Sequence, residues 1–375
     1  MSNDELVFLV VVAGRLFIPL LIFRFPLPAI LACLVLDAAD QTIFQNNTNL
    51  NLDGYQSYDK ALDVFYLAMA YLSTLRNWVS PFAANTAMFL WYYRLVGVVI
   101  FELTQERAVL IIFPNTFEYF FIVYETIRLA WNPARLTNRM VIGLAAFIWI
   151  FIKLPQEWWL HIAKLDFTDF MKEDVFGVSV DTSWGDAISE NLWFVGLLIV
   201  LVVVVVVGVR YALAKAPPPD WKFSFDVDSH LGPPPTGYVR PERLLSWGLL
   251  EKVVLTALVS VIFALIVPDV DGTFLRVSFA VSVIVIANAA LHRWLSVRGW
   301  EWDSVMRNFF FTLVLNLGIT LGYIWLLRRS DDPIDEAGTL FFVLLLTLII
   351  TLFDRYRHTR DARLAPSWPP ATPTI

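Results

Sequence analysis

Between Trp193 and Val209 the chain reads WFVGLLIVLVVVVVVGV, a run of 17 residues without a charge. A helix needs about 20 mostly apolar residues to cross the hydrocarbon core of a bilayer, so this run is a strong candidate for a membrane span. The whole chain is 58% hydrophobic and 17% charged, whereas about 25% of the residues are charged in a typical soluble domain. These features predict an integral membrane protein with little soluble structure.

Further apolar stretches predict an all-α, polytopic integral membrane bundle of about eleven transmembrane helices. The predicted spans lie near 6–23, 27–44, 60–77, 82–103, 107–130, 140–156, 193–214, 246–267, 273–293, 305–326 and 337–354. Only a short turn, Arg24 to Pro26, separates the first two spans, so we expect them to form a tight antiparallel hairpin.

The charges of the loops predict an orientation, because Lys and Arg accumulate on the cytoplasmic side. Basic residues follow the fifth, seventh and ninth predicted spans and recur in the C-terminal tail, and with eleven spans these four regions share one side. The acidic loop 157–192 and the acidic turn 268–272 fall on the other side. We therefore predict a multi-pass protein of the cell membrane, with its N-terminus outside and its C-terminus inside.

The predicted spans divide the chain into four parts. Residues 1–156 form a charged transmembrane bundle of about six helices, and the outer loop 157–192 contains an amphipathic helix in the membrane interface. Residues 193–363 form a second group of about five helices, with an extended Pro-rich inner linker at 215–244. The tail 364–375 is predicted to be disordered. Because Asp4 and Glu5 precede the first apolar stretch, we expect a retained helix and not a cleaved signal.

Composition also limits the partners and cofactors. The net charge of −6 and the pI near 5.3 argue against a nucleic-acid partner. The single cysteine, Cys33, excludes an internal disulfide framework and a Cys-based zinc site. The predicted partners are the lipid bilayer and a lipid or small charged substrate; protein partners are not predicted.

Charged residues inside the predicted spans are the main functional signal, because each costs a few kcal/mol unless it faces a partner or a water-filled cavity. They concentrate in the first five spans: Arg15, Asp37, Asp40, Asp59, Asp63, Arg94, Glu102, Glu118 and Glu125. Spans seven to eleven are far less charged, so we expect the function to lie in the N-terminal half.

Four of these charges lie at a similar depth in consecutive spans. At ~1.5 Å rise per residue, Arg15, Asp37, Arg94 and Glu118 are each about 10–16 Å from the outer end of their helices. Mutual ion pairing would let two cations and two carboxylates share this layer. Two interpretations remain open: a structural ion-pair network that fixes helix packing, or a polar cavity that binds a charged substrate.

The acids nearer the outer surface predict a metal site. Asp37 and Asp40 are three residues apart and Asp59 and Asp63 are four apart, so each pair shares a helix face. Carboxylates gathered in this way repel one another unless they share a cation or a proton. Hard oxygen ligands suit Mg²⁺, Ca²⁺ or Mn²⁺. Two interpretations stay open: Asp37, Asp40, Asp59 and Asp63 hold Mg²⁺ or another divalent cation, or they are simply at the water-facing ends of their helices.

The sequence IIFPNTFEYFF in the fifth span predicts a kinked helix. Pro114 removes a backbone hydrogen bond, and we expect Asn115 to satisfy the carbonyl that it frees. Irregular backbone inside a membrane is tolerated where it lines a cavity. Arg15, Arg94, Glu102, Asn115 and Glu118 are accordingly the candidate substrate-binding residues.

The stretch from Asp37 to Asp63, DAADQTIFQNNTNLNLDGYQSYDKALD, resembles a degraded form of the CDP-alcohol phosphotransferase signature. That signature is D-x2-D-G-x2-A-R, x8, G-x3-D-x3-D; this chain has Gln41, Phe44 and Gln45 at the glycine, alanine and arginine positions, and its second acid pair is displaced by one residue. The resemblance implies that the four acids hold a divalent metal, that Asp59 and Asp63 are catalytic, and that Asp63 is the base that activates an alcohol.

Three functions remain open from the sequence. The first is a transporter or channel-type component that uses the buried charges as a relay or substrate site. The alternative is a metal-dependent membrane enzyme that acts on a lipid headgroup or lipid-linked substrate, so whether the chain is an enzyme stays undecided. The third is a membrane assembly or scaffold protein in which the charges serve packing alone.

Overall fold

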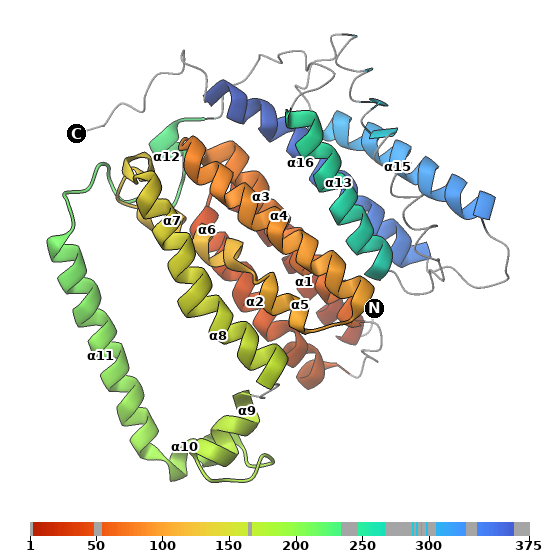
Figure 1. The fold of residues 1–375 in the computed structure, drawn as a ribbon. Helices are drawn as coiled ribbons and strands as arrows, with labels where there is room; N and C mark the ends of the chain where they lie inside the picture. The colour runs from red at the N-terminus through yellow and green to blue at the C-terminus, as the bar shows by residue number, and fades with distance from the viewer. Residues whose placement is uncertain are drawn as a thin grey trace.

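The computed structural model describes residues 3–48, 55–163, 167–233, 247–266, 305–327 and 336–363, together with single positions between 287 and 298. These residues form helices joined by turns and irregular segments, and no strand occurs among them. The all-α prediction is therefore confirmed for the described part of the chain (Figure 1).

Six helices among the described residues are long and apolar enough to cross a membrane. They are Asp4–Phe23, Pro81–Thr104, Ala108–Arg128, Asn138–Ile162, Leu192–Lys215 and Gly338–Asp361. Each coincides with a predicted span, which supports the coarse prediction of a membrane protein. Helices also form at the second, third, eighth and tenth predicted spans, whereas most of the ninth, 273–293, lies outside the described residues.

The N-terminal bundle is built from helices that follow one another closely. α1 (Asn3–Phe17) continues as the 3-10 helix η1 (Ile18–Phe23), and a two-residue turn leads into α2 (Pro26–Asn47). α1 and η1 pack against α2, so the predicted hairpin is confirmed. α3 (Tyr55–Asn77) and α4 (Pro81–Thr104) complete this part of the bundle. Ser80 caps α4 by accepting a hydrogen bond from the Ala83 amide at 3.4 Å.

The fifth predicted span is two helices, α5 (Ala108–Ile112) and α6 (Thr116–Arg128), separated at Pro114. The sixth is one continuous helix in which α-helical and π-helical turns alternate: α7 (Asn138–Phe147), η3 (Ile148–Lys153), α8 (Leu154–Glu157) and η4 (Trp158–Ala163). It therefore extends past the boundary expected at 156. The first seven residues of the expected outer loop, 157–163, continue this helix, and no separate amphipathic helix begins there.

The rest of the segment between 163 and 192 forms a small unit of its own. It contains α9 (Phe167–Asp169), the π-helical turn η5 (Phe170–Val175) and α10 (Trp184–Glu190). Met171, Phe176 and Ala187 form a minor core that is separate from the main one. α11 (Leu192–Lys215) follows and stands apart from the bundle (Figure 1).

The linker expected to be extended folds back onto the bundle as far as it is described. Residues 216–233 include α12 (Asp228–Leu231), and acids of this segment pair with arginines at the helix ends: Asp226 with Arg24 at 2.9 Å and Asp220 with Arg135 at 2.6 Å. The hydrogen bond from Arg24 lowers the pKa of Asp226. The expected extended linker is thus corrected for residues 216–233, because the basic helix ends attract its acids.

The C-terminal helices are α13 (Trp247–Ile266), α15 (Val305–Leu327) and α16 (Glu336–Arg363). α16 packs against α3, α13 and α15. Buried Lys252 on α13 pairs with Asp354 on α16 at 2.9 Å, and Arg357 pairs with Glu251. These helices therefore carry buried ion pairs, and arginines expected in a cytoplasmic tail belong to α16. The tail 364–375 lies outside the described residues.

Candidate functional site: the Arg15 cluster

Three helices bring one arginine and four aspartates together. Arg15 comes from the last turn of α1, Asp37 and Asp40 from one face of α2, and Asp59 and Asp63 from one face of α3. α2 packs against both α1 and α3, so the two acid pairs meet at the arginine. We call these five residues the Arg15 cluster.

The guanidinium group of Arg15 binds all four carboxylates. Its Nη2 donates to Oδ1 of Asp37 at 2.5 Å and to Oδ1 of Asp63 at 2.7 Å. Its Nη1 donates to Asp40 and to Asp59. Such a shared, charge-assisted arrangement fixes the positions of three helices at once.

The cluster has a buried floor and an open rim. The side chains of Arg15 and Asp40 are 4% and 3% exposed, whereas those of Asp37, Asp59 and Asp63 are 30%, 37% and 40% exposed. Three carboxylates are therefore accessible from one side while the arginine lies beneath them.

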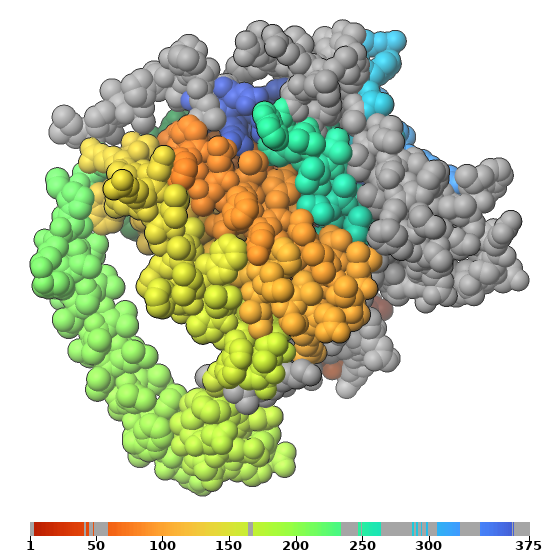
Figure 2. Space-filling model, in the orientation of Figure 1, coloured from red at the N-terminus to blue at the C-terminus, as the bar shows by residue number. Residues whose placement is uncertain are grey.

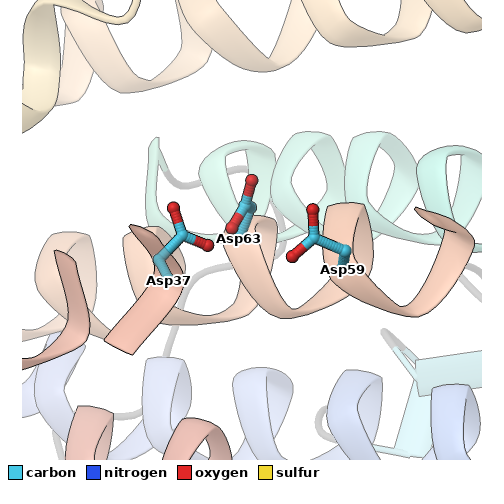
Figure 3. A group of neighbouring side chains, drawn as sticks. All are labelled: Asp37, Asp59 and Asp63. Carbon is cyan, nitrogen blue, oxygen red and sulfur yellow. The ribbon is translucent and has the colours of Figure 1, made fainter. Parts of the chain in front are cut away.

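The three accessible aspartates have a spacing that suits one metal ion. One carboxylate oxygen from each of Asp37, Asp59 and Asp63 lies within 4.8 Å of the other two (Figure 3). An all-oxygen donor set fits Mg²⁺, Ca²⁺ or Mn²⁺. Asp40, the fourth expected ligand, is not part of this group of three. A metal ion would compete with Arg15, which already binds Asp37 and Asp63.

The charge of the cluster is unbalanced. Four carboxylates face one guanidinium, which leaves three formal negative charges if every aspartate is ionised. Opposing charges or protons must be shared to hold carboxylates at such distances. The cluster therefore attracts cations. Glu102, a predicted site residue, does not join it but pairs with Lys60 at 3.1 Å.

A second polar group lies around Glu118 on α6. Tyr66 donates to Oε1 of Glu118 at 2.6 Å, and the side-chain amide of Asn115 donates to Oε2 at 2.9 Å. Lys153 approaches Oε2 at 3.8 Å. Tyr66 is three residues after Asp63 on α3 and shares its helix face. Tyr66 thus connects this group with the rim of the Arg15 cluster.

This polar group continues along the helix 138–163. Glu157 accepts a hydrogen bond from the Asn115 backbone amide at 3.4 Å and pairs with His161 at 3.0 Å. Glu118, Lys153 and Glu157 are all buried. Lys153, Glu157 and His161 were missed in the sequence, although their spacing of four residues would place them on one helix face.

The break between α5 and α6 is held by α4. Tyr93 donates to the Ile112 carbonyl at 2.8 Å, and Arg94 donates to the Phe113 carbonyl at 3.0 Å. The predicted kink at Pro114 is therefore confirmed, but the expectation that Asn115 satisfies the freed carbonyl is wrong. The side-chain amide of Asn115 donates to Glu118 instead.

The sequence suggested that Arg15, Asp37, Arg94 and Glu118 pair with one another, and only part of this network forms. Arg15 does pair with Asp37. Arg94 binds a backbone carbonyl and Glu118 binds Tyr66 and Asn115, so these two residues form a neighbouring site at the helix break and not an ion pair with each other.

Comparison of the chain with protein-family models, with curated proteins and with solved structures finds no match in any of the three. The geometry of the Arg15 cluster and of the helix break is therefore the basis for the functional argument.

Proposed function

We propose that the chain is a multi-pass membrane transport protein that binds a cation at the rim of the Arg15 cluster. The observation that carries this proposal is that one guanidinium serves four carboxylates, three of them accessible and within 4.8 Å of one another. An entering cation would take over Asp37, Asp59 and Asp63 from Arg15, which would stay paired with buried Asp40.

The broken helix beside the cluster favours transport. Discontinuous helices are common at the substrate and ion sites of membrane transporters, where unwound backbone and helix ends face the bound species. Here the break between α5 and α6 is followed directly by Glu118, which Tyr66 links to the helix face of Asp59 and Asp63. Cation binding could therefore change the contacts that hold the break.

The test uses Mn²⁺ as the probe and the full-length protein in phosphatidylcholine vesicles that contain calcein. Entry of Mn²⁺ quenches calcein, and Mn²⁺ binding to the purified protein is measured separately by electron paramagnetic resonance. We expect Asp63→Asn to weaken binding by about tenfold or more, since it removes one of three ligands, and to slow entry. Asp181→Asn, the same chemical change at an exposed position, is the matched control and should match the parent.

The outcomes separate the hypotheses. If the protein binds no Mn²⁺, or if Asp63→Asn and Asp181→Asn bind it equally, the cation site is wrong. Binding without entry would remove transport and favour the second candidate, a metal-dependent enzyme acting on a lipid headgroup or lipid-linked substrate. The three-aspartate group supports that candidate. Release of CMP from CDP-diacylglycerol, with transfer of the phosphatidyl group to the hydroxyl of an added acceptor alcohol, in the presence of Mn²⁺ would establish it.

A further inference from the structure

Among the described residues, α11 has no packing partner along its length. None of its residues is buried, and its main contact within this part of the chain is with α10 at its beginning. Apolar side chains from Leu192 to Leu213 are exposed on every face of the helix. Figure 2 shows α11 as a separate arm with an open window between it and the helix 138–163.

The window is closed at both ends by the chain itself. At one end, Trp131 donates from Nε1 to the Pro217 carbonyl at 2.9 Å, and the Asp220 amide donates to the Ala130 carbonyl at 2.9 Å. These bonds tie the chain after α11 to the chain before α7. At the other end, the minor core of Met171, Phe176 and Ala187, with Phe194 packed against it, holds the start of α11.

Both long sides of the window are apolar. The helix 138–163 packs its inner face on α4 and α6. It exposes large apolar side chains along its whole length: Met140, Ile142, Phe147, Ile150, Phe151, Trp158, Leu160 and Ile162. Leaving two such surfaces in water costs about 25 cal/mol for each Å², so an apolar occupant is required.

The composition of α11 favours lipid over another protein helix as this occupant. Helices that pack in membranes approach through small residues repeated every four positions or through polar contacts. The only glycines of α11, Gly196 and Gly208, are twelve residues apart, and neither has an atom near the position of a Cβ. From Leu197 to Val207 the surface consists of Val and Leu with one Ile, which acyl chains cover without any specific register.

α11, the helix 138–163 and the segments that join them at both ends form a frame around the window. One end of this frame carries exposed cations. Arg139 begins the helix 138–163, while Arg210 and Lys215 end α11 at the same end of the window. Among the described residues none of these three forms an ion pair, although Lys215 lies over the Tyr211 ring at 4.4 Å. Basic groups between transmembrane helices at one membrane face bind the head groups of anionic lipids.

We propose that this frame holds a phospholipid with an anionic head group. Its phosphate pairs with Arg139, Arg210 and Lys215, and its acyl chains fill the window between α11 and the helix 138–163. The lipid would then act as the missing packing partner of α11. This site lies apart from the Arg15 cluster, so the inference stands independently of cation transport.

The first test is native mass spectrometry of the full-length protein with added phosphatidylglycerol or phosphatidylcholine of the same acyl composition. We expect preferential retention of phosphatidylglycerol. Replacing Arg139, Arg210 and Lys215 together by Gln should weaken this retention by about tenfold or more, without changing that of phosphatidylcholine. The control replaces Arg107, Arg298 and Arg307, which are exposed cations away from the window. Equal losses in both triple variants would overturn the proposal.

The second test identifies the occupant of the window. Phe151, which is 66% exposed, is replaced by the photoreactive analogue p-benzoylphenylalanine, and the protein is irradiated in phosphatidylglycerol vesicles. Cross-links to the lipid are expected, and fewer of them in the triple variant of Arg139, Arg210 and Lys215. A cross-linked dimer of the chain in place of lipid adducts would show that a second copy fills the window and would overturn the proposal.

Discussion

Arg76 donates from Nη2 to both carboxylate oxygens of Asp228, at 2.9 Å each, and so joins the end of α3 to the segment that folds back after α11. The arginine side chain is 8% exposed and also donates to the Phe23 carbonyl at 2.8 Å. α3 carries Asp59 and Asp63 near its other end. The fold-back segment therefore fixes the same helix that supplies half of the acids of the Arg15 cluster.

This contact predicts that replacing Asp228 destabilises the protein much more than replacing the neighbouring Asp226. Asp228→Asn should destabilise the protein by about 1–3 kcal/mol, because it leaves a buried guanidinium without its carboxylate. Asp226→Asn should change stability by less than about 1 kcal/mol, because its partner Arg24 is 62% exposed. Thermal unfolding of both variants in the same detergent measures this, and equal shifts would contradict it.

Because α4 closely approaches the helix break, we predict that any side chain larger than hydrogen at position 97, where Gly97 stands, destabilises the protein. A Cβ there would lie 2.1 Å from Cβ of Phe113, so Gly97→Ala should cost about 1–3 kcal/mol or more through overpacking. Gly143→Ala, on a helix surface with no neighbour near a Cβ, should be neutral or stabilising by up to about 1 kcal/mol.

The atom that clashes makes this test sharper. Phe113→Ala keeps its Cβ and should fail to rescue Gly97→Ala, whereas Phe113→Gly should rescue part of the loss. Unfolding temperatures of the single and double variants provide the measurement. If Phe113→Ala rescues as well as Phe113→Gly, the contact is made by the ring and not by the backbone approach.

The Arg15 cluster predicts that its arginine becomes essential when no other cation is present. Arg15→Gln should destabilise the protein by about 3–5 kcal/mol, because it leaves four neighbouring carboxylates uncompensated. Adding Mn²⁺ should recover part of the unfolding temperature, because the ion replaces the lost charge at Asp37, Asp59 and Asp63. Lys252→Gln, which breaks another buried pair, should show no recovery, and an equal Mn²⁺ effect in both variants would refute the prediction.

The fold-back segment should loosen in mild acid. Burial lowers the pKa of His230, which stacks on Trp221 with ring centroids 4.5 Å apart. A histidine whose pKa is lower in the folded state favours folding as the neutral base. Its contribution is therefore complete at neutral pH and decreases as the pH falls through the ordinary histidine value of about 6.5.

Hydrogen exchange of residues 220–232, corrected for the intrinsic effect of pH, measures this loosening. Protection of the Val227 amide, which donates to the Arg24 carbonyl at 3.0 Å, should decrease between pH 7 and pH 5.5. His230→Asn should remove most of this pH dependence. The prediction is wrong if the variant and the parent respond alike, or if amides in α3 lose protection to the same extent.

Much of the local structure could be predicted from the sequence. The apolar run of α11 and the turn between Arg24 and Pro26 predicted a long helix and a hairpin, because length and hydropathy act over neighbouring residues. Pro114 predicted the helix break for the same reason, since proline lacks the amide that the helix needs. The membrane topology with eleven spans and an outer N-terminus stays a prediction.

The candidate site was predicted less completely, because its partners are distant in the chain. Helical spacing placed Asp37 with Asp40 and Asp59 with Asp63 on common faces, but it could not show that Arg15 binds all four. The sequence also suggested Asn115 for the freed carbonyl, whereas Asn115 donates to Glu118 and Arg94 of α4 binds the Phe113 carbonyl at the break. Tyr66, Lys153 and Glu157 were missed as site residues. Their place in the polar group depends on contacts with Glu118 or Asn115, which the sequence does not show.

Residue chemistry and local spacing thus determined the helices, the excess of intramembrane acid in the first spans and the broken fifth span. Only the tertiary structure decided which cation meets which acid. It put Arg15 beneath four carboxylates, folded Asp226 and Asp228 back onto arginines, and left α11 without a packing partner in the described part of the chain. The physical reason is that electrostatic pairing and packing depend on distances between helices, which a linear pattern of residues does not contain.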